Sequence, residues 1–134
     1  MIDVTHPTIQ KWFNDGRIRV QCTFEDANAA LYAFNCGPGW YDIIDRLLTD
    51  LFHLGWNGQV FQVKEKFGGL RFYIGEGTEE IFNRIDQAEK ESLVTCEHCG
   101  EEGSAGGNGF WIKTLCPKHM ELYKQGRLIW AKND

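Results

Sequence analysis

Three cysteines and a histidine near the C-terminal end have the residue types and the spacing of a zinc site. Cys96 and Cys99 form one pair, and Cys116 and His119 form a second pair after sixteen intervening residues. Zinc in proteins is held by four thiolate or imidazole ligands in a tetrahedron, and a CxxC pair presents two thiolates from one tight turn. Gly100 suits that turn because glycine adopts backbone conformations that other residues avoid. The pattern therefore predicts one bound Zn²⁺.

The residues around these four ligands predict a structural metal in a treble-clef finger. The segment between the two pairs suits a loop and a strand, and Pro117 suits the first position of a helix that carries His119. His98 is a competing ligand, but it lies inside the tight turn, where a side chain usually points outward. If protein groups take all four positions, none remains for an activated water. We therefore expect the metal to stabilise the fold.

The remaining cysteines and histidines show no second pairing in the sequence. Cys22 is predicted to be a core thiol on a strand, and Cys36 a more exposed thiol with no neighbour that lowers its pKa. His6 and His53 are isolated and are interpreted as packing or surface residues. A solvated helix face, with no acid/base pair, is predicted for Asp42, Asp45 and Asp50. With no phosphate-binding glycine loop either, the chain is predicted not to be an enzyme.

Two alternating runs, residues 60–67 and 70–74, predict a β-hairpin around Gly68-Gly69. If the two glycines form the turn, one face carries the apolar side chains and the other carries the cations. The facing pairs are then Phe67 with Leu70, Glu65 with Phe72 and Val63 with Ile74, and the apolar face also includes Phe61. The opposite face carries Gln62, Lys64, Lys66, Arg71 and Tyr73.

This hairpin contains the candidate binding residues Lys64, Lys66, Arg71 and Tyr73. Their face suits a phosphate or an acidic partner, although a solvated strand face needs no function. Glu65 falls on the apolar face, where a carboxylate needs a partner or a shifted pKa. A salt bridge to a lysine or arginine is the favoured interpretation, and contact with a ligand is the alternative.

The other segments predict an α+β fold, with a small antiparallel sheet and flanking helices. Apolar residues at helical spacing predict helices over 40–54 and 78–93, and a shorter helix is expected over 6–14. Residues 17–24 alternate like a strand, and residues 25–35 fit either a helix or a strand. We expect a core at residues 1–94 and the finger at 95–134, packed together as one cooperative unit.

Composition limits the classes of function. The chain of 134 residues has 43% hydrophobic residues and a formal net charge of −5, which gives no general attraction to nucleic acid or anionic membranes. Residues 1–7 lack the pattern of a signal peptide, and no apolar run is long enough to span a membrane. Five cysteines, with two in a CxxC pair, suit metal binding in a reducing cytoplasm.

Three short segments carry a resemblance to known proteins. They are VKEKFGGLRFY at residues 63–73, AEKES at residues 88–92 and CEHCG at residues 96–100. Over about residues 38–120 the chain resembles small uncharacterised proteins of bacteriophages and prophages. The resemblance implies a bacterial host cell and an accessory protein that binds a host protein. Because some small phage proteins inhibit CRISPR effector nucleases, it also implies an anti-defence role as one expectation.

These observations predict a non-enzymatic, zinc-stabilised protein-binding module of the phage type, whose expected partner is a host protein such as a defence nuclease. An acidic protein can occupy a basic nucleic-acid channel, which would give the net charge a role. The alternative is an accessory protein that binds nucleic acid through the finger and the cationic hairpin face.

Overall fold

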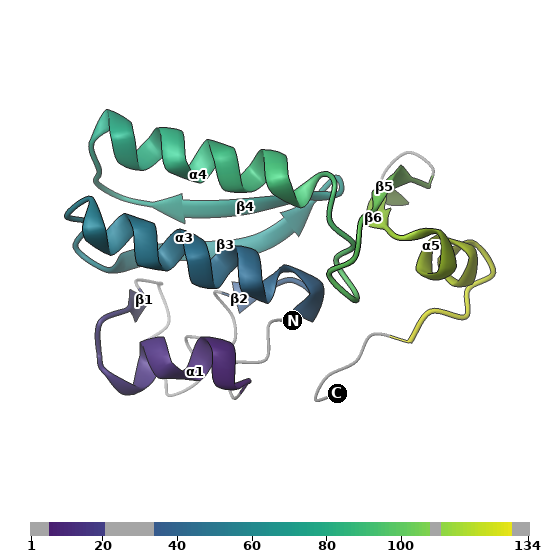
Figure 1. Ribbon diagram of the computed structural model, residues 1–134, viewed down its shortest axis with the longest axis horizontal. Helices are drawn as coiled ribbons and strands as arrows, with labels where there is room; N and C mark the ends of the chain where they lie inside the picture. Colours follow the sequence, from purple (N-terminus) through teal and green to yellow (C-terminus); the bar gives the residue numbers. More distant parts are fainter. Residues whose placement is uncertain (1–5, 21–33, 108–110, 130–134) are drawn as a thin grey trace.

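The computed structural model of the chain describes residues 6–20, 34–107 and 111–129, which form a sheet, a row of helices along it and a finger at one end (Figure 1). The helices along the sheet are α1 (Pro7–Asn14), α3 (Tyr41–His53) and α4 (Glu79–Ser92), with the short 3-10 helix η1 (Pro38–Trp40) before α3. The sheet contains β1 (Arg19–Val20), β2 (Phe34–Asn35), β3 (Gln59–Lys66) and β4 (Gly69–Ile74). The finger contains β5 (Ser104–Gly106), β6 (Lys113–Leu115) and α5 (Pro117–Lys124). The predicted α+β class is confirmed.

Helix α3 provides the apolar stripe that its sequence predicts. Its buried residues recur every three or four positions, so they form one face directed at the sheet. Those residues are Tyr41, Ile43, Ile44, Leu47, Leu48 and Leu51. Gly55 follows the helix with a φ of +89°, a left-handed conformation that glycine adopts without steric cost. The predicted helix over 40–54 is thus confirmed within one residue at each end.

Helix α4 lies beside α3 and along β4 (Figure 1). Its first turn is capped by Thr78, whose hydroxyl accepts a hydrogen bond from the Ile81 backbone N–H at 3.2 Å. Ile81 and Ile85 are buried toward the core. Arg84 donates to Asp50 on α3 at 2.7 Å. The helix predicted over 78–93 is confirmed within one residue at each end.

Strand β3 is the centre of the sheet. It pairs antiparallel with β4 along one edge, and parallel with β1 and then β2 along the other. The antiparallel hairpin was predicted, whereas the two short parallel pairings were not. Of the strand expected over 17–24, residues 19–20 form β1. Residues 21–24 lie outside the described residues. Residues 25–33 also lie outside them, and Phe34–Asn35 form a strand.

The register of the hairpin differs from the prediction by one position on each strand. The turn is Phe67-Gly68, with φ of +53° and +83°, so Lys66 faces Gly69 and Glu65 faces Leu70. Positive φ at both central residues is the primed geometry that matches strand twist. A left-handed phenylalanine costs about 1 kcal/mol. Gly69 instead lies in the strand, where a Cβ would stand 3.3 Å from the Leu93 side chain at the end of α4.

An irregularity between Val60 and Gln62 changes which side chain enters the core. Val60 is fully buried, whereas Phe61 is 39% exposed, so the prediction that Phe61 lies on the buried face was wrong. A bulge of this kind inserts an extra residue and reverses the alternation beyond it. Val63, Leu70 and Phe72 lie on the buried face as predicted.

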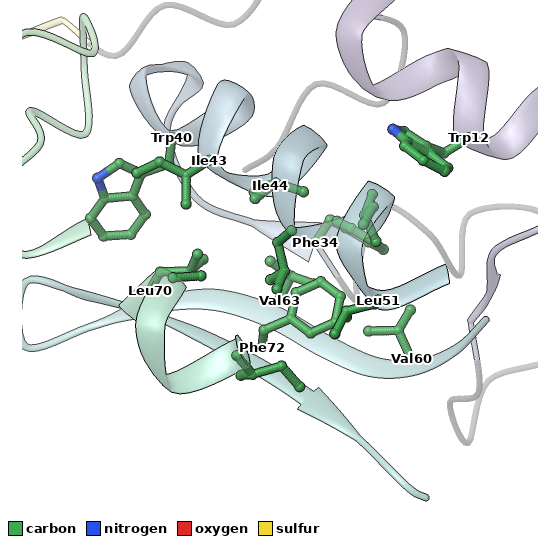
Figure 2. Close-up of a cluster of buried hydrophobic side chains, with 14 of the residues drawn as sticks. Trp12, Phe34, Trp40, Ile43, Ile44, Leu51, Val60, Val63, Leu70 and Phe72 are labelled. Carbon is green, nitrogen blue, oxygen red and sulfur yellow. The ribbon is translucent and has the colours of Figure 1, made fainter. Parts of the chain in front are cut away.

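The core lies between the helices and the sheet, as Figure 2 shows for side chains from both layers. Ile43, Ile44 and Leu51 extend from α3 toward Val63 and Val60 on β3. At the end near the finger, the buried Trp40 indole donates to the Thr95 backbone carbonyl at 2.9 Å. The core therefore continues up to the segment that begins the finger.

Helix α1 packs against α3 and confirms the short helix predicted near the N-terminal end. His6 caps it by accepting a hydrogen bond from the Thr8 backbone N–H at 3.2 Å. Trp12 donates to Asp45 on α3 at 2.9 Å. Within the described ranges, no helix has the length and apolar character needed to cross a membrane.

Candidate metal centre

The finger is built from a tight turn, a two-stranded sheet and a short helix. The turn closes when the Gly100 N–H donates to the Cys96 carbonyl at 2.9 Å, with Gly100 at a φ of +84°. Strands β5 and β6 pair antiparallel, and β6 leads into Cys116 and then α5, with Pro117 in its first turn. This order of elements is the treble-clef layout that the sequence predicts.

Cys96, Cys99, Cys116 and His119 meet in one cluster. Their ligand atoms all lie within 4.8 Å of one another. The Cys99 and Cys116 sulfurs are 3.8 Å apart, and the Cys96 sulfur is 3.6 Å from Nδ1 of His119. A zinc tetrahedron with its usual bond lengths has edges of about 3.8 Å between sulfurs and about 3.6 Å from sulfur to nitrogen. The four residues are therefore positioned to bind a metal ion, and their chemistry and spacing fit zinc.

The surroundings of the cluster shift the pKa of Cys99, Cys116 and His119. Burial, together with the neighbouring thiols of Cys96 and Cys116, raises the pKa of the Cys99 thiol to about 11. Burial opposes ionisation of Cys116 as well, but the backbone N–H groups of His119 and Lys118 help to lower its pKa. Burial and the nearby His98 lower the pKa of His119, which favours the neutral imidazole that a metal needs. A divalent metal supplies the positive charge that holds such thiols as thiolates.

His98 is not a member of the ligand cluster, in agreement with the prediction. Its ring lies against that of His119, with the centroids 4.1 Å apart. Its Nε2 is 2.9 Å from the Ile129 backbone carbonyl, so this nitrogen donates to the carbonyl. His98 therefore covers one side of the metal ligand and contacts the segment after α5.

The remaining candidate residues are placed as follows. Cys36 is buried, which corrects the expectation of a more exposed thiol, and burial together with Glu97 raises its pKa well above the usual value. Cys22 lies outside the described residues. Asp42 is exposed and Asp50 half-exposed, as predicted for a solvated face, whereas Asp45 is partly covered by the Trp12 indole and Lys11 of α1. His53 is exposed at the end of α3.

Glu97, inside the tight turn of the finger, connects the finger to the core. Its side chain is only 3% exposed, and Oε2 accepts a hydrogen bond from the Gly37 N–H at 2.9 Å. Its backbone carbonyl accepts from the Gly39 N–H at 2.7 Å. A Cβ at Gly39 would stand 2.1 Å from the Cys96 carbonyl, so only glycine allows this approach. Metal ligands and core residues are thus in direct contact.

Lys113, on β6 of the finger, lies between two carboxylates. Its ammonium is 2.7 Å from Glu65 on the hairpin and 3.4 Å from Glu97. Burial works against the charged lysine, but attraction to Glu97 and Glu65 outweighs it and raises the pKa of Lys113. Burial raises the pKa of Glu97, although Lys113 and the Gly37 N–H act in the opposite direction. The favoured prediction of a salt bridge for Glu65 is confirmed, with a partner that the sequence did not identify.

The cationic hairpin face is arranged as its alternation predicts, with one member engaged elsewhere. Lys64 and Arg71 face each other across the strands, and Lys64 lies 5.9 Å from the centre of the Tyr73 ring. Arg71 forms an ion pair with Glu89 on α4. Tyr73 and Phe61 are each about 40% exposed, so aromatic surface lies beside the lysines.

No known protein family, curated protein or solved structure matches the chain. The fold and the cluster therefore define a protein with an α+β core and a Cys₃His group able to hold a metal ion. The resemblance to phage proteins stays a prediction.

Proposed function

We propose that the chain is a zinc-stabilised binding module that acts through a surface and not through catalysis. The observation that carries the proposal is the Cys₃His cluster, whose four ligand atoms lie within 4.8 Å of one another. Four protein ligands complete the coordination that structural zinc prefers, whereas catalytic zinc keeps a position for water. The role of the ion in this proposal is to fold the finger.

The proposed binding surface, named here the hairpin surface, consists of Lys64, Lys66, Arg71 and Tyr73 together with Phe61. It combines cations with exposed aromatic rings, and such rings are enriched at protein interfaces. Lys66 is exposed and has no ion pair within the described ranges. This surface is a cationic region on a chain whose net charge is −5.

The partner we propose is a host protein, and a defence nuclease is the finer proposal. A nuclease active site combines carboxylates that hold divalent metals with a basic channel for nucleic acid. The hairpin surface suits such carboxylates, and the net negative charge of the chain favours approach to the channel. The resemblance of residues 38–120 to phage proteins supports the same choice.

Charge reversal on the hairpin surface tests the proposal. Immobilised chain should retain a host protein from bacterial lysate, and Lys64→Glu/Lys66→Glu should release it. Lys90→Glu is the matched control, because Lys90 is exposed on α4 and outside the hairpin surface. The same proteins retained by all three chains would contradict the proposed surface. For the nuclease, inhibition of DNA cleavage by a purified CRISPR effector should depend on the same lysines.

Nucleic-acid binding is the second candidate, favoured by the aromatic rings beside the lysines, a combination that binds single strands by stacking. The net charge of −5 opposes it, because a polyanion is repelled outside the local contact. A mobility shift of DNA or RNA at low salt, lost in Lys64→Glu/Lys66→Glu, would favour this candidate over a protein partner.

A further inference from the structure

The hairpin turn and the metal centre are connected by an unbroken chain of polar contacts. The Gly68 N–H donates to Glu65 Oε2 at 2.8 Å, and Glu65 Oε1 lies 2.7 Å from the Lys113 ammonium. Lys113 is in turn 3.4 Å from Glu97, which stands between the ligands Cys96 and Cys99. The first contact lies within the hairpin, the second joins the hairpin to the finger, and the third lies inside the finger.

A second contact holds the same turn from the other side. The Thr114 hydroxyl, fully buried on β6, donates to the Gly68 carbonyl at 2.6 Å. The side chain of Ile112 stands 3.3 Å from the position of a Cβ on Gly68. Both polar groups of the Gly68 backbone are therefore bound, one to Glu65 and the other directly to the finger.

This turn has a conformation that needs support. Phe67 has a φ of +53°, the only positive φ of a non-glycine residue within the described ranges. A non-glycine residue keeps a left-handed backbone conformation only where contacts with the surrounding structure stabilise it by more than that conformation costs. The finger supplies those surroundings through Thr114 and Lys113, and Lys66 of the hairpin surface is held beside Phe67 as a result.

The finger has little apolar material with which to form this contact unaided. Its buried cluster consists of Cys96, Leu115 and Cys116, two of which are metal ligands, and α5 has no buried residue. Strand β6, which carries both Lys113 and Thr114, leads directly into the ligand Cys116, so a metal bound there would help to fix its position. The metal centre and the hairpin turn are two ends of one rigid connection.

We infer that Lys113, Glu65 and Glu97 are positioning residues that couple zinc binding in the finger to the conformation of the hairpin turn. The hairpin surface is thus held in its binding conformation in the zinc-loaded protein. The part of this inference that concerns partner binding rests on the proposed function, whereas the coupling itself does not. Coupling between two sites is reciprocal, so a change at the hairpin end must alter zinc affinity.

Glu65→Gln is the decisive variant, because Glu65 lies on the core hairpin and the substitution keeps its shape. The glutamine oxygen can still accept from Gly68, but its attraction for Lys113 is lost. Coupling between sites typically changes affinity by about 5- to 150-fold. Competition with a chromophoric chelator should therefore show zinc binding at least about fivefold weaker in Glu65→Gln than in wild type.

Lys124→Met is the matched control, because Lys124 is an exposed lysine of the finger at the end of α5, away from the ligand pair at the start of that helix. Its zinc affinity should stay within about twofold of wild type, which is below the usual range for coupled sites. The double variant Glu65→Gln/Lys113→Met should bind zinc no more weakly than Lys113→Met alone, since one substitution already breaks the connection. An additive loss in the double variant would show that the two residues act separately.

Amide hydrogen exchange of the zinc-loaded proteins supplies the readout at the turn. In Glu65→Gln the Gly68 amide should exchange faster than in wild type, while the Val63 amide in mid-strand is unchanged. Zinc affinity and Gly68 exchange equal to wild type would overturn the inference. If both change as expected but no host protein binds the hairpin surface, the coupling stands and the proposed function fails.

Discussion

The core and the finger reach a folded state by different means. The core buries a cluster of twenty described residues, from Ile9 to Ala88, between its helices and its sheet. The apolar cluster of the finger has three buried residues, and two of these are cysteines of the metal cluster. Burial of apolar surface is the main force that stabilises a domain, so the core can depend on it whereas the finger cannot. In the proposed function the metal folds the finger, while contacts to the core fix its orientation.

Loss of the metal should have the largest effect and should separate the two regions. With Cys96→Ser/Cys99→Ser, or after a strong chelator, the finger should lose roughly 10 kcal/mol or more of apparent folding free energy. Amide signals of β5 and β6 should then lose their dispersion in NMR spectra, while those of α3 persist. A finger that keeps its protected amides without metal would contradict the assignment.

Truncation of one buried side chain in the core should give the second largest effect. It should destabilise the core and leave the zinc content of the finger unchanged. Leu47 is fully buried in α3, and Leu47→Ala should lower the free energy of unfolding by about 4 kcal/mol, measured by urea denaturation. Zinc content should stay at one ion per chain while the core is folded, because no ligand lies near that side chain in the sequence. As a control, Ile129→Ala removes an exposed side chain and should change stability by less than about 0.5 kcal/mol.

A methyl group placed between the two regions should sharpen the comparison further. Gly39→Ala puts a Cβ 2.1 Å from the Cys96 carbonyl, so the finger must move away from the core. We expect a loss of about 3 kcal/mol in thermal or chemical unfolding and weaker zinc binding. Gly16→Ala is the control, because no atom lies within 4 Å of the added Cβ and only the left-handed φ of +67° opposes alanine, at a cost of about 1 kcal/mol. Equal losses in the two variants would show that the Cβ at Gly39 does not displace the finger.

Removal of a helix cap should give the smallest effect and should be confined to the core. Thr78→Ala deletes the hydroxyl that accepts from the Ile81 N–H. The expected loss in the free energy of unfolding is about 1 kcal/mol. Zinc affinity measured in parallel should equal that of wild type, and a lower affinity would show coupling between the finger and the first turn of α4.

Local patterns made the ligand set and the long helices predictable. The spacing of Cys96, Cys99, Cys116 and His119 reflects the metal geometry directly, and the stripes of α3 and α4 reflect helical periodicity. The hairpin was predictable in type, but Gly68-Gly69 allowed two registers. In the register that the structure shows, Gly69 lies close to Leu93 at the end of α4, and the Gly68 carbonyl accepts from Thr114, a contact distant in the sequence.

The connection between finger and core could not be predicted because its members are far apart in the sequence. Glu65 needed a cation, and nothing in its own strand indicates that Lys113, 48 positions away, provides it. From its place in the sequence, Glu97 is one of the two residues between the cysteines of a metal-binding turn. In the structure its side chain is almost fully buried and accepts a hydrogen bond from the Gly37 N–H. The pairings of β1 and β2 with β3 span two residues each, and although residues 17–24 alternate like a strand, the alternation does not indicate which strand they pair with.

Metal content is the most direct test of the central claim that Cys96, Cys99, Cys116 and His119 hold one zinc ion. Native mass spectrometry of the purified chain should show one zinc per chain for the wild type. It should show none for Cys116→Ser/His119→Ala, which removes one whole ligand pair. A folded wild-type chain without zinc, or a variant that retains a full equivalent, would contradict the assignment.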